Sequence, residues 1–149
     1  MIRSFPAAFA ILLAAAPLAA QTVARCENHF AASVHSIAEP LEANTATYAN
    51  GAIRIVLMDV GAPACCPEYL VVLHPAGSEP DEQYRKCTLV SLEPDLGFSR
   101  IDFAGRATSY DPARGLTISF GVEIPLGDAF APGGLDVTIN QATGEVSLN

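Results

Sequence analysis

Residues 116–124 read LTISFGVEI, and this stretch decides the fold class. Large apolar side chains occupy every second position and alternate with threonine, serine, glycine and glutamate. Successive side chains of a β-strand point to opposite faces of its sheet, so the pattern puts the apolar side chains on one face. The stretch therefore predicts a strand that covers a core with one face and meets water with the other.

The sequence around this stretch also has the pattern of short strands separated by turns. From residue 45 onward, short apolar runs are separated by Gly, Pro, Asn and Asp, which is typical of antiparallel β structure. Asn50-Gly51 predicts a tight hairpin, because both residue types tolerate positive φ. The unbroken apolar run 69–73 predicts a central strand with both faces covered. Further strands are expected over residues 45–49, 52–60, 68–74, 86–92, 98–104 and 135–139, with a last strand carrying Val146 and Leu148.

One helix is expected near the N-terminus, over residues 25–38. Apolar side chains recur there at helical intervals, and a proline at position 40 closes the segment. These apolar positions are Cys26, Phe30, Val34 and Ile37. A strand is the competing interpretation, because alternate residues from Phe30 to Val34 are apolar as well.

The expected fold class is therefore mainly β. A sheet with one apolar face must cover that face, and the stable outcomes are an antiparallel β-sandwich or a small barrel of seven to eight short strands with one N-terminal helix. Residues 21–149 have the length of one domain, and no linker or repeat divides them. We expect a single disulfide-stapled domain over residues 21–149.

Residues 1–20 have the composition of a signal peptide. Arg3 gives a positive start, an uncharged apolar run follows, and Ala19-Ala20 supplies small residues where a peptidase could cut. The apolar run is shorter than the roughly 20 residues that a spanning helix needs. Arg25 precedes Cys26, whereas lipidation requires a small residue there. We therefore expect a cleaved leader and a periplasmic or secreted product that is neither membrane-spanning nor lipidated.

Four cysteines follow the leader: Cys26, Cys65, Cys66 and Cys87. An exported chain meets an oxidising compartment, where such thiols form disulfides. Adjacent residues of an extended backbone point in opposite directions, so Cys65 and Cys66 more easily serve two partners than each other. We expect Cys26 and Cys87 each to bond one member of the adjacent pair, without assigning which bonds which. A Cys65–Cys66 disulfide that acts as a switch is the alternative.

A soft-metal or redox protein is one alternative function. The Cys65-Cys66 pair, with Cys26-x-x-His29, His35 and His74, offers soft ligands for copper or zinc. The spacing gives only one short Cys-His pair, and disulfides would consume the thiols. No Cys-x-x-Cys redox motif occurs either. We therefore assign no metal-binding residue and no cofactor.

An enzyme with an unrecognised site is the other alternative. The sequence contains no nucleophile elbow, phosphate loop, metalloprotease motif or dinucleotide fingerprint. A general acid and a general base could come from the carboxylates Asp59, Asp102 and Glu123 only if the fold brings two of them together. Strands usually carry such residues on the solvent-exposed face of a sheet. No catalytic residue is assigned, and the chain is expected to be non-catalytic.

The charge of the chain limits its partners. It has 8 basic and 16 acidic side chains, and Arg3 is the only charged residue of the leader, so the mature charge is 7 minus 16, or −9. This charge repels nucleic acid and attracts a basic partner at low salt. We expect a small exported binding or inhibitory module that engages an unidentified protein or small ligand, with a basic partner favoured.

Overall fold

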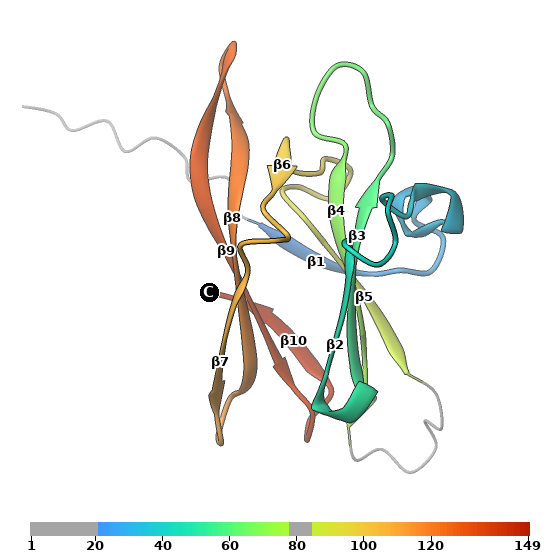
Figure 1. The fold of residues 1–149 in the computed structure, drawn as a ribbon, viewed down its shortest axis with the longest axis vertical. Helices are drawn as coiled ribbons and strands as arrows, with labels where there is room; N and C mark the ends of the chain where they lie inside the picture. The colour runs from blue at the N-terminus through green and yellow to red at the C-terminus, as the bar shows by residue number, and fades with distance from the viewer. Residues whose placement is uncertain (1–20, 78–84) are drawn as a thin grey trace, which may run out of the picture.

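In the computed structural model, which describes residues 21–77 and 85–149, ten strands form two antiparallel sheets that face each other (Figure 1). The expected signal peptide, residues 1–20, lies outside the described residues. The first sheet has the order β1-β5-β4-β3-β2. Its strands are β1 (Thr22–Arg25), β2 (Thr45–Tyr48), β3 (Ile53–Asp59), β4 (Glu68–His74) and β5 (Lys86–Ser91).

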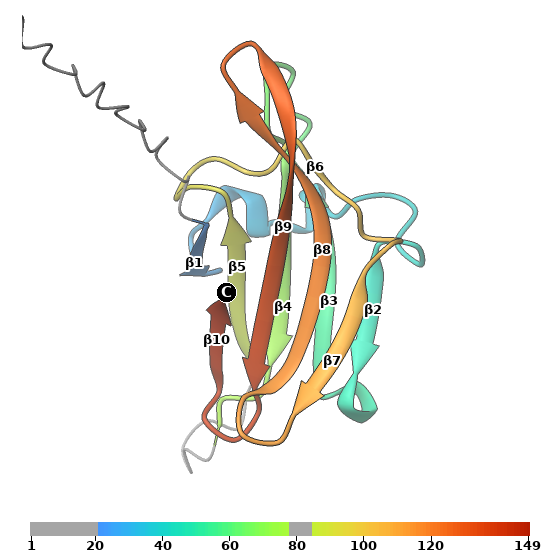
Figure 2. The ribbon, with the colours of Figure 1, turned by 90° about the vertical axis from the view of Figure 1, so that its left-hand side faces the viewer.

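The second sheet is built around one long hairpin. The hairpin consists of β8 (Gly115–Leu126) and β9 (Ala129–Asn140), and β10 (Glu145–Leu148) pairs with the second half of β9. Two short strands share the other edge of β8: β7 (Ala107–Asp111) and β6 (Arg100–Ile101). Figure 2 shows β8 and β9 running in front of β3 and β4.

The core lies between the two sheets. Its central side chains come from alternate positions of β3, β4, β8 and β9, and they are buried: Ile53, Ile55, Leu57, Leu70, Val72, Ile118, Phe120, Val122, Leu135, Val137 and Ile139. Burying each large aliphatic side chain stabilises the fold by roughly 1.5–3 kcal/mol. The predicted strand over residues 116–124 is confirmed, and two face-to-face sheets are the sandwich form of the predicted fold.

The central strand β4 is covered on both faces, as its unbroken apolar run predicts. Leu70 and Val72 point into the core, whereas Tyr69 and Val71 belong to a second buried cluster on the outer face of the first sheet. The chain between β1 and β2 covers this outer cluster and contributes the fully buried Ala31.

The prediction of one helix over residues 25–38 is wrong. The segment contains two single-turn 3-10 helices, η1 (Phe30–Ala32) and η2 (Val34–Ser36), separated by Ser33 in an extended conformation. The side chains of His29 and Ser33 accept the backbone N–H groups of Ala31 and His35, and such local bonds compete with a continuous helix. Two of the helically spaced apolar residues, Phe30 and Val34, are exposed, so no apolar stripe is buried there.

The predicted hairpin at Asn50-Gly51 is confirmed. Both residues have positive φ inside the short turn η3 (Ala49–Gly51), which joins β2 to β3. The strand expected over residues 98–104 is reduced to β6, because the side chain of Asp102 accepts the N–H of Gly105 and turns the chain. The described residues form ten strands instead of the expected seven to eight, because β1 and β7 carry mostly exposed residues and show little apolar alternation.

Within the described residues, no helix has the length and apolar character needed to cross a membrane.

His74 is a buried polar group at the end of β4. The residue is 1 % exposed, Nδ1 lies 3.0 Å from the Pro75 carbonyl and Nε2 lies 2.8 Å from Thr88 Oγ1. A carbonyl only accepts, so Nδ1 donates to it, whereas the Thr88 hydroxyl can donate or accept; in the neutral ring that burial favours, Nε2 accepts from this hydroxyl. Burial, assisted by the nearby positive charge of Lys86, lowers the pKa of His74.

This lowered pKa predicts a loss of stability in mild acid. As the pH falls below the ordinary histidine pKa of about 6.5, His74 is protonated in the unfolded chain but stays neutral in the folded chain. Proton binding therefore stabilises the unfolded state, and the free energy of unfolding decreases. Urea unfolding at about pH 7.5 and about pH 5 should show a larger decrease in the wild type than in His74→Gln. Equal decreases in the two proteins would contradict the neutral assignment of His74.

Candidate functional site

The loop between β3 and β4 carries the adjacent cysteines at one end of the sandwich. Residues 60–67 form this loop, and Val60 N–H closes it by donating to the Pro67 carbonyl at 3.0 Å. The tip of the β8–β9 hairpin lies at the same end of the molecule in both views (Figures 1 and 2). This end therefore presents the disulfide loop and the hairpin tip together.

The disulfides differ from the expected connectivity. The structure joins Cys65 to Cys66 and Cys26 to Cys87, and none of the four cysteines is free. The expectation assumed an extended backbone at the adjacent pair, but Cys66 has a φ of 68°, so the chain is not extended there and the two sulfurs meet. Cys26 follows β1 instead of lying on a helix, and pairing of β1 with β5 brings its Cα to 5.4 Å from that of Cys87.

The segment before β6 packs closely against the disulfide loop. The hydroxyl oxygen of Ser99 lies 3.5 Å from Cys66 Sγ and 3.8 Å from Cys65 Sγ. A β-carbon at Gly97 would collide with the carbonyl oxygens of Cys66 and Glu68, so only glycine allows this approach. Two backbone hydrogen bonds between Glu68 and Phe98 fix the contact.

Several charged side chains surround Glu68, the first residue of β4. Its carboxylate accepts the backbone N–H of Ile101, and burial raises its pKa above the ordinary glutamate value. The negative charges of Asp59 and Glu123 raise the pKa further, while the hydrogen bond from Ile101 and the charge of Arg100 oppose the shift. Three carboxylates, counting Glu68 itself, and one guanidinium therefore act on one another around Glu68, the residue that follows the disulfide loop.

A shallow hollow of about 320 Å³ lies on the outer face of the second sheet beside β6. It is lined by Arg100, Asp102, Gly121, Val122, Glu123, Pro132 and Gly133. Asp102 and Glu123, two of the three carboxylates singled out in the sequence, thus lie at one hollow, while Asp59 lies near Glu68. The Asp102 carboxylate already accepts the N–H of Gly105, so its role is at least partly to hold the turn.

The residues considered for a soft-metal site do not come together. Cys66 lies just before β4, whereas His74 lies at its far end with both ring nitrogens in hydrogen-bonding contact. His29 contacts the carbonyl of Pro94 through Nε2 at 3.0 Å, and Cys26 is in a disulfide. Among residues 21–77 and 85–149, no group of three His, Cys, Asp or Glu side chains is placed to hold a metal ion.

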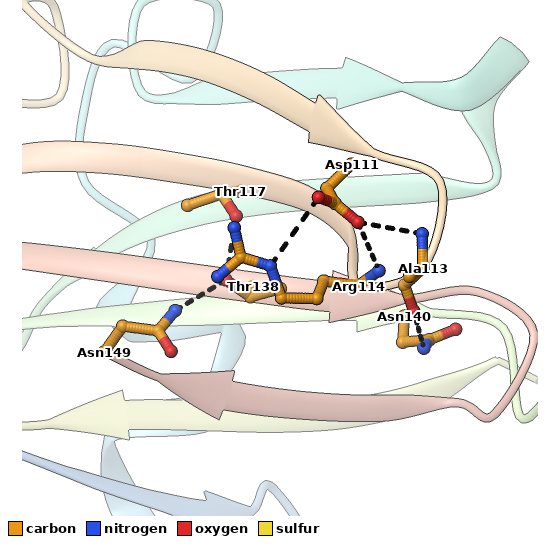
Figure 3. A network of polar contacts seen from close by, with 7 residues as sticks. All are labelled: Asp111, Ala113, Arg114, Thr117, Thr138, Asn140 and Asn149. Atoms are coloured by element: carbon orange, nitrogen blue, oxygen red, sulfur yellow. Dashed lines mark hydrogen bonds and ion pairs between the residues drawn. The ribbon is translucent and has the colours of Figure 1, made fainter.

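A polar network at the opposite end of the second sheet holds the β7–β8 turn (Figure 3). Asp111 accepts the backbone N–H groups of Ala113 and Arg114 at 2.8 and 3.0 Å, and these bonds lower the pKa of its carboxyl. The guanidinium of Arg114 lies 3.9 Å from the same carboxylate. Asn140 donates to the Ala113 carbonyl at 3.4 Å and ties the turn to the end of β9.

Three more polar side chains lie beside this turn. Thr138 contacts the Thr117 hydroxyl at 2.8 Å and accepts the Asn149 side-chain amide at 2.8 Å. They lie at or beside a smaller hollow of about 160 Å³. Because these groups bind each other and the turn backbone, the network explains the local structure and needs no ligand.

The chain matches no protein-family model, no curated protein and no solved structure. Ser99, Gly97 and Glu68 lie around the adjacent pair, but only the four cysteines stand out in the sequence. No sequence pattern connects residues 65 and 66 with residue 99, because their contact arises only when two loops that are distant in the sequence pack together.

The two disulfides should contribute very differently to stability. Loop-closure entropy assigns about 4 kcal/mol to a bridge across 61 residues and about 1 kcal/mol to a bridge between neighbours. We expect the double variant Cys26→Ser, Cys87→Ser to lose about 4 kcal/mol in urea unfolding and Cys65→Ser, Cys66→Ser to lose about 1 kcal/mol. Equal losses would show that the adjacent bridge also holds the fold.

The raised pKa of Glu68 predicts a stabilising substitution. An acid with a raised folded pKa holds its proton to higher pH than in the unfolded chain, so the free energy of unfolding falls as the pH rises through that range. Glu68→Gln keeps an acceptor for Ile101 N–H and removes the charge. We expect the variant to melt higher than the wild type at about pH 7 and to lose this advantage towards about pH 4. A lower melting temperature at neutral pH would contradict this account.

Proposed function

We propose that this chain is an exported, periplasmic or secreted, non-catalytic binding or inhibitory module. The two-sheet body is the scaffold, and the tip of the β8–β9 hairpin contacts the partner. One observation carries the proposal. The tip exposes two large apolar side chains, Leu126 (66 % exposed) and Phe130 (57 % exposed), that contribute nothing to the core.

The tip extends past the strands that flank its base. β6 pairs with β8 only at Ile101 and Arg100, opposite Val122 and Glu123, and β10 pairs with β9 only from Val137 onward. Among the described strands, residues 124–131 therefore pair only with each other, around a turn in which Gly127 has a φ of 60°. Pro125 and Pro132 within these strands limit further edge pairing, which leaves side-chain contact as the way to engage a partner.

The partner favoured by the charge of the chain is a basic protein. The mature charge of −9 attracts such a partner, and locally Asp128 at the turn with Glu123 and Asp102 near the base outnumber Arg100, which lines the same hollow. The leader supports export, and the Cys26–Cys87 bridge suits an oxidising compartment.

A double substitution at the tip tests this proposal. Leu126→Ser with Phe130→Ser removes exposed side chains, so the stability should change by less than about 0.5 kcal/mol. The intact mass of tagged wild type recovered from the exported fraction should show that the mature chain begins near Gln21. The same protein should bring down a basic partner that is lost at high salt. The tip variant should lose that partner, whereas the control Val34→Ser, at a residue 78 % exposed, should retain it. Retention by the tip variant would refute the assignment of the surface.

A redox role is the second candidate, and one observation favours it: the adjacent cysteines bond each other. A bridge between neighbours contributes little loop-closure entropy, so stability alone does not account for it.

A further inference from the structure

We propose that the Cys65–Cys66 disulfide is a site of thiol–disulfide exchange, at which an external thiolate attacks Cys65 Sγ and Cys66 leaves as the thiolate. This inference rests on the redox candidate and is independent of the binding surface at the hairpin tip.

The burial of the two residues sets the direction of attack. Cys66 is 2 % exposed, whereas Cys65 is partly exposed on the loop. Exchange requires an approach to one sulfur along the line of the bond that breaks, with the other sulfur as leaving group. Cys65 is the more accessible residue of the two, so the nucleophile approaches Cys65.

Ser99 is placed to assist the leaving group. Its hydroxyl oxygen lies closer to Cys66 Sγ, at 3.5 Å, than to Cys65 Sγ, at 3.8 Å. A hydroxyl that donates to a developing thiolate lowers the pKa of that thiol, and a leaving thiol of lower pKa departs faster. The backbone N–H of Ser99 donates to the Glu123 carbonyl at 3.0 Å, which ties the residue to β8.

The exchange is balanced in two steps. The attacking thiolate forms a bond to Cys65 Sγ, the Cys65–Cys66 bond breaks, and the Cys66 thiolate takes a proton from water. A second external thiolate then attacks the mixed disulfide, which releases the oxidised small-molecule disulfide and leaves Cys65 as a thiolate that is also protonated. Two external thiols are oxidised and one protein disulfide is reduced.

The surrounding charge selects the kind of thiol. Among the described residues, the groups that act on Glu68, directly after the loop, are Asp59, Glu123 and Arg100, so with Glu68 itself the carboxylates outnumber the guanidinium three to one; an anionic thiol is repelled and a cationic thiol is attracted. The natural reductant is therefore a thiol carried by a neutral or basic molecule.

The Cys26–Cys87 bridge should resist the same reagent. Its reduction removes the large loop-closure contribution and is opposed by the folded state, whereas reduction of the adjacent pair is opposed only weakly.

Mass spectrometry of the folded mature chain tests the direction of attack. After brief treatment with cysteamine and acid quenching, we expect the adduct on Cys65, a free thiol on Cys66 and an intact Cys26–Cys87 bridge. Ser99→Ala should slow the reaction roughly 3- to 10-fold, the rate equivalent of one hydrogen bond. The control Ser109→Ala, at an exposed residue of β7, should react like the wild type. An adduct on Cys66, an unchanged rate in Ser99→Ala, or earlier reduction of Cys26–Cys87 would each overturn the proposal.

A pair of oppositely charged thiols tests the charge selection. Rates with cysteamine and with 2-mercaptoethanesulfonate are each divided by the rate of the same thiol with hydroxyethyl disulfide. We expect the cysteamine ratio to be the larger at low salt and the difference to shrink at high salt. Equal ratios at low salt would overturn the charge selection.

The tip variant separates this inference from the binding function. Leu126→Ser with Phe130→Ser should exchange thiols at the wild-type rate, because the tip lies outside the disulfide loop. If the wild type does not exchange thiols, the exchange proposal fails, but the loss of the partner in the tip variant still tests the binding surface. Each proposal is therefore tested by its own measurement.

Discussion

The packing of β8 and β9 against β3 and β4 is the interaction on which the rest of the structure depends. Each of these strands presents a row of apolar side chains to the same space, and none of the rows can be buried without the opposite sheet. A shift of one residue in any of the strands would turn its apolar row outward, so the registers are fixed together. The two sheets therefore share one core, and neither can bury its inner face alone.

The first sheet needs a second cover, because β4 has large apolar side chains on both faces. Tyr69 and Val71 point away from the core, and the chain between β1 and β2 lies over them. The Cys26–Cys87 bridge joins the start of this covering segment to β5, so a covalent bond holds a layer that has no regular helix of its own. This explains why a layer of two single 3-10 turns stays in place.

The sequence was most informative where the pattern of apolar residues was regular. The strand over residues 116–124 follows from alternation, β4 from its unbroken apolar run, and the hairpin between β2 and β3 from Asn50-Gly51. The helix was wrong because helical spacing at Phe30 and Val34 says nothing about whether a core is available to bury them. The disulfide partners could not be predicted, since the positive φ at Cys66 is set by the tertiary position of the loop. Ser99 was missed for the same reason.

The two disulfides differ in their contribution to stability because they close loops of very different length. Cys26–Cys87 spans 61 residues and strongly restricts the unfolded chain, whereas Cys65–Cys66 spans neighbours and restricts it little. A bond that stabilises the fold strongly is poorly suited to reversible chemistry, because breaking it also weakens the fold. A bond that stabilises the fold weakly can open while the sandwich persists. The adjacent pair lies in a loop at the end of the sheets, where a local change of covalent structure alters the surface beside Ser99 and Glu68 and leaves the core unchanged.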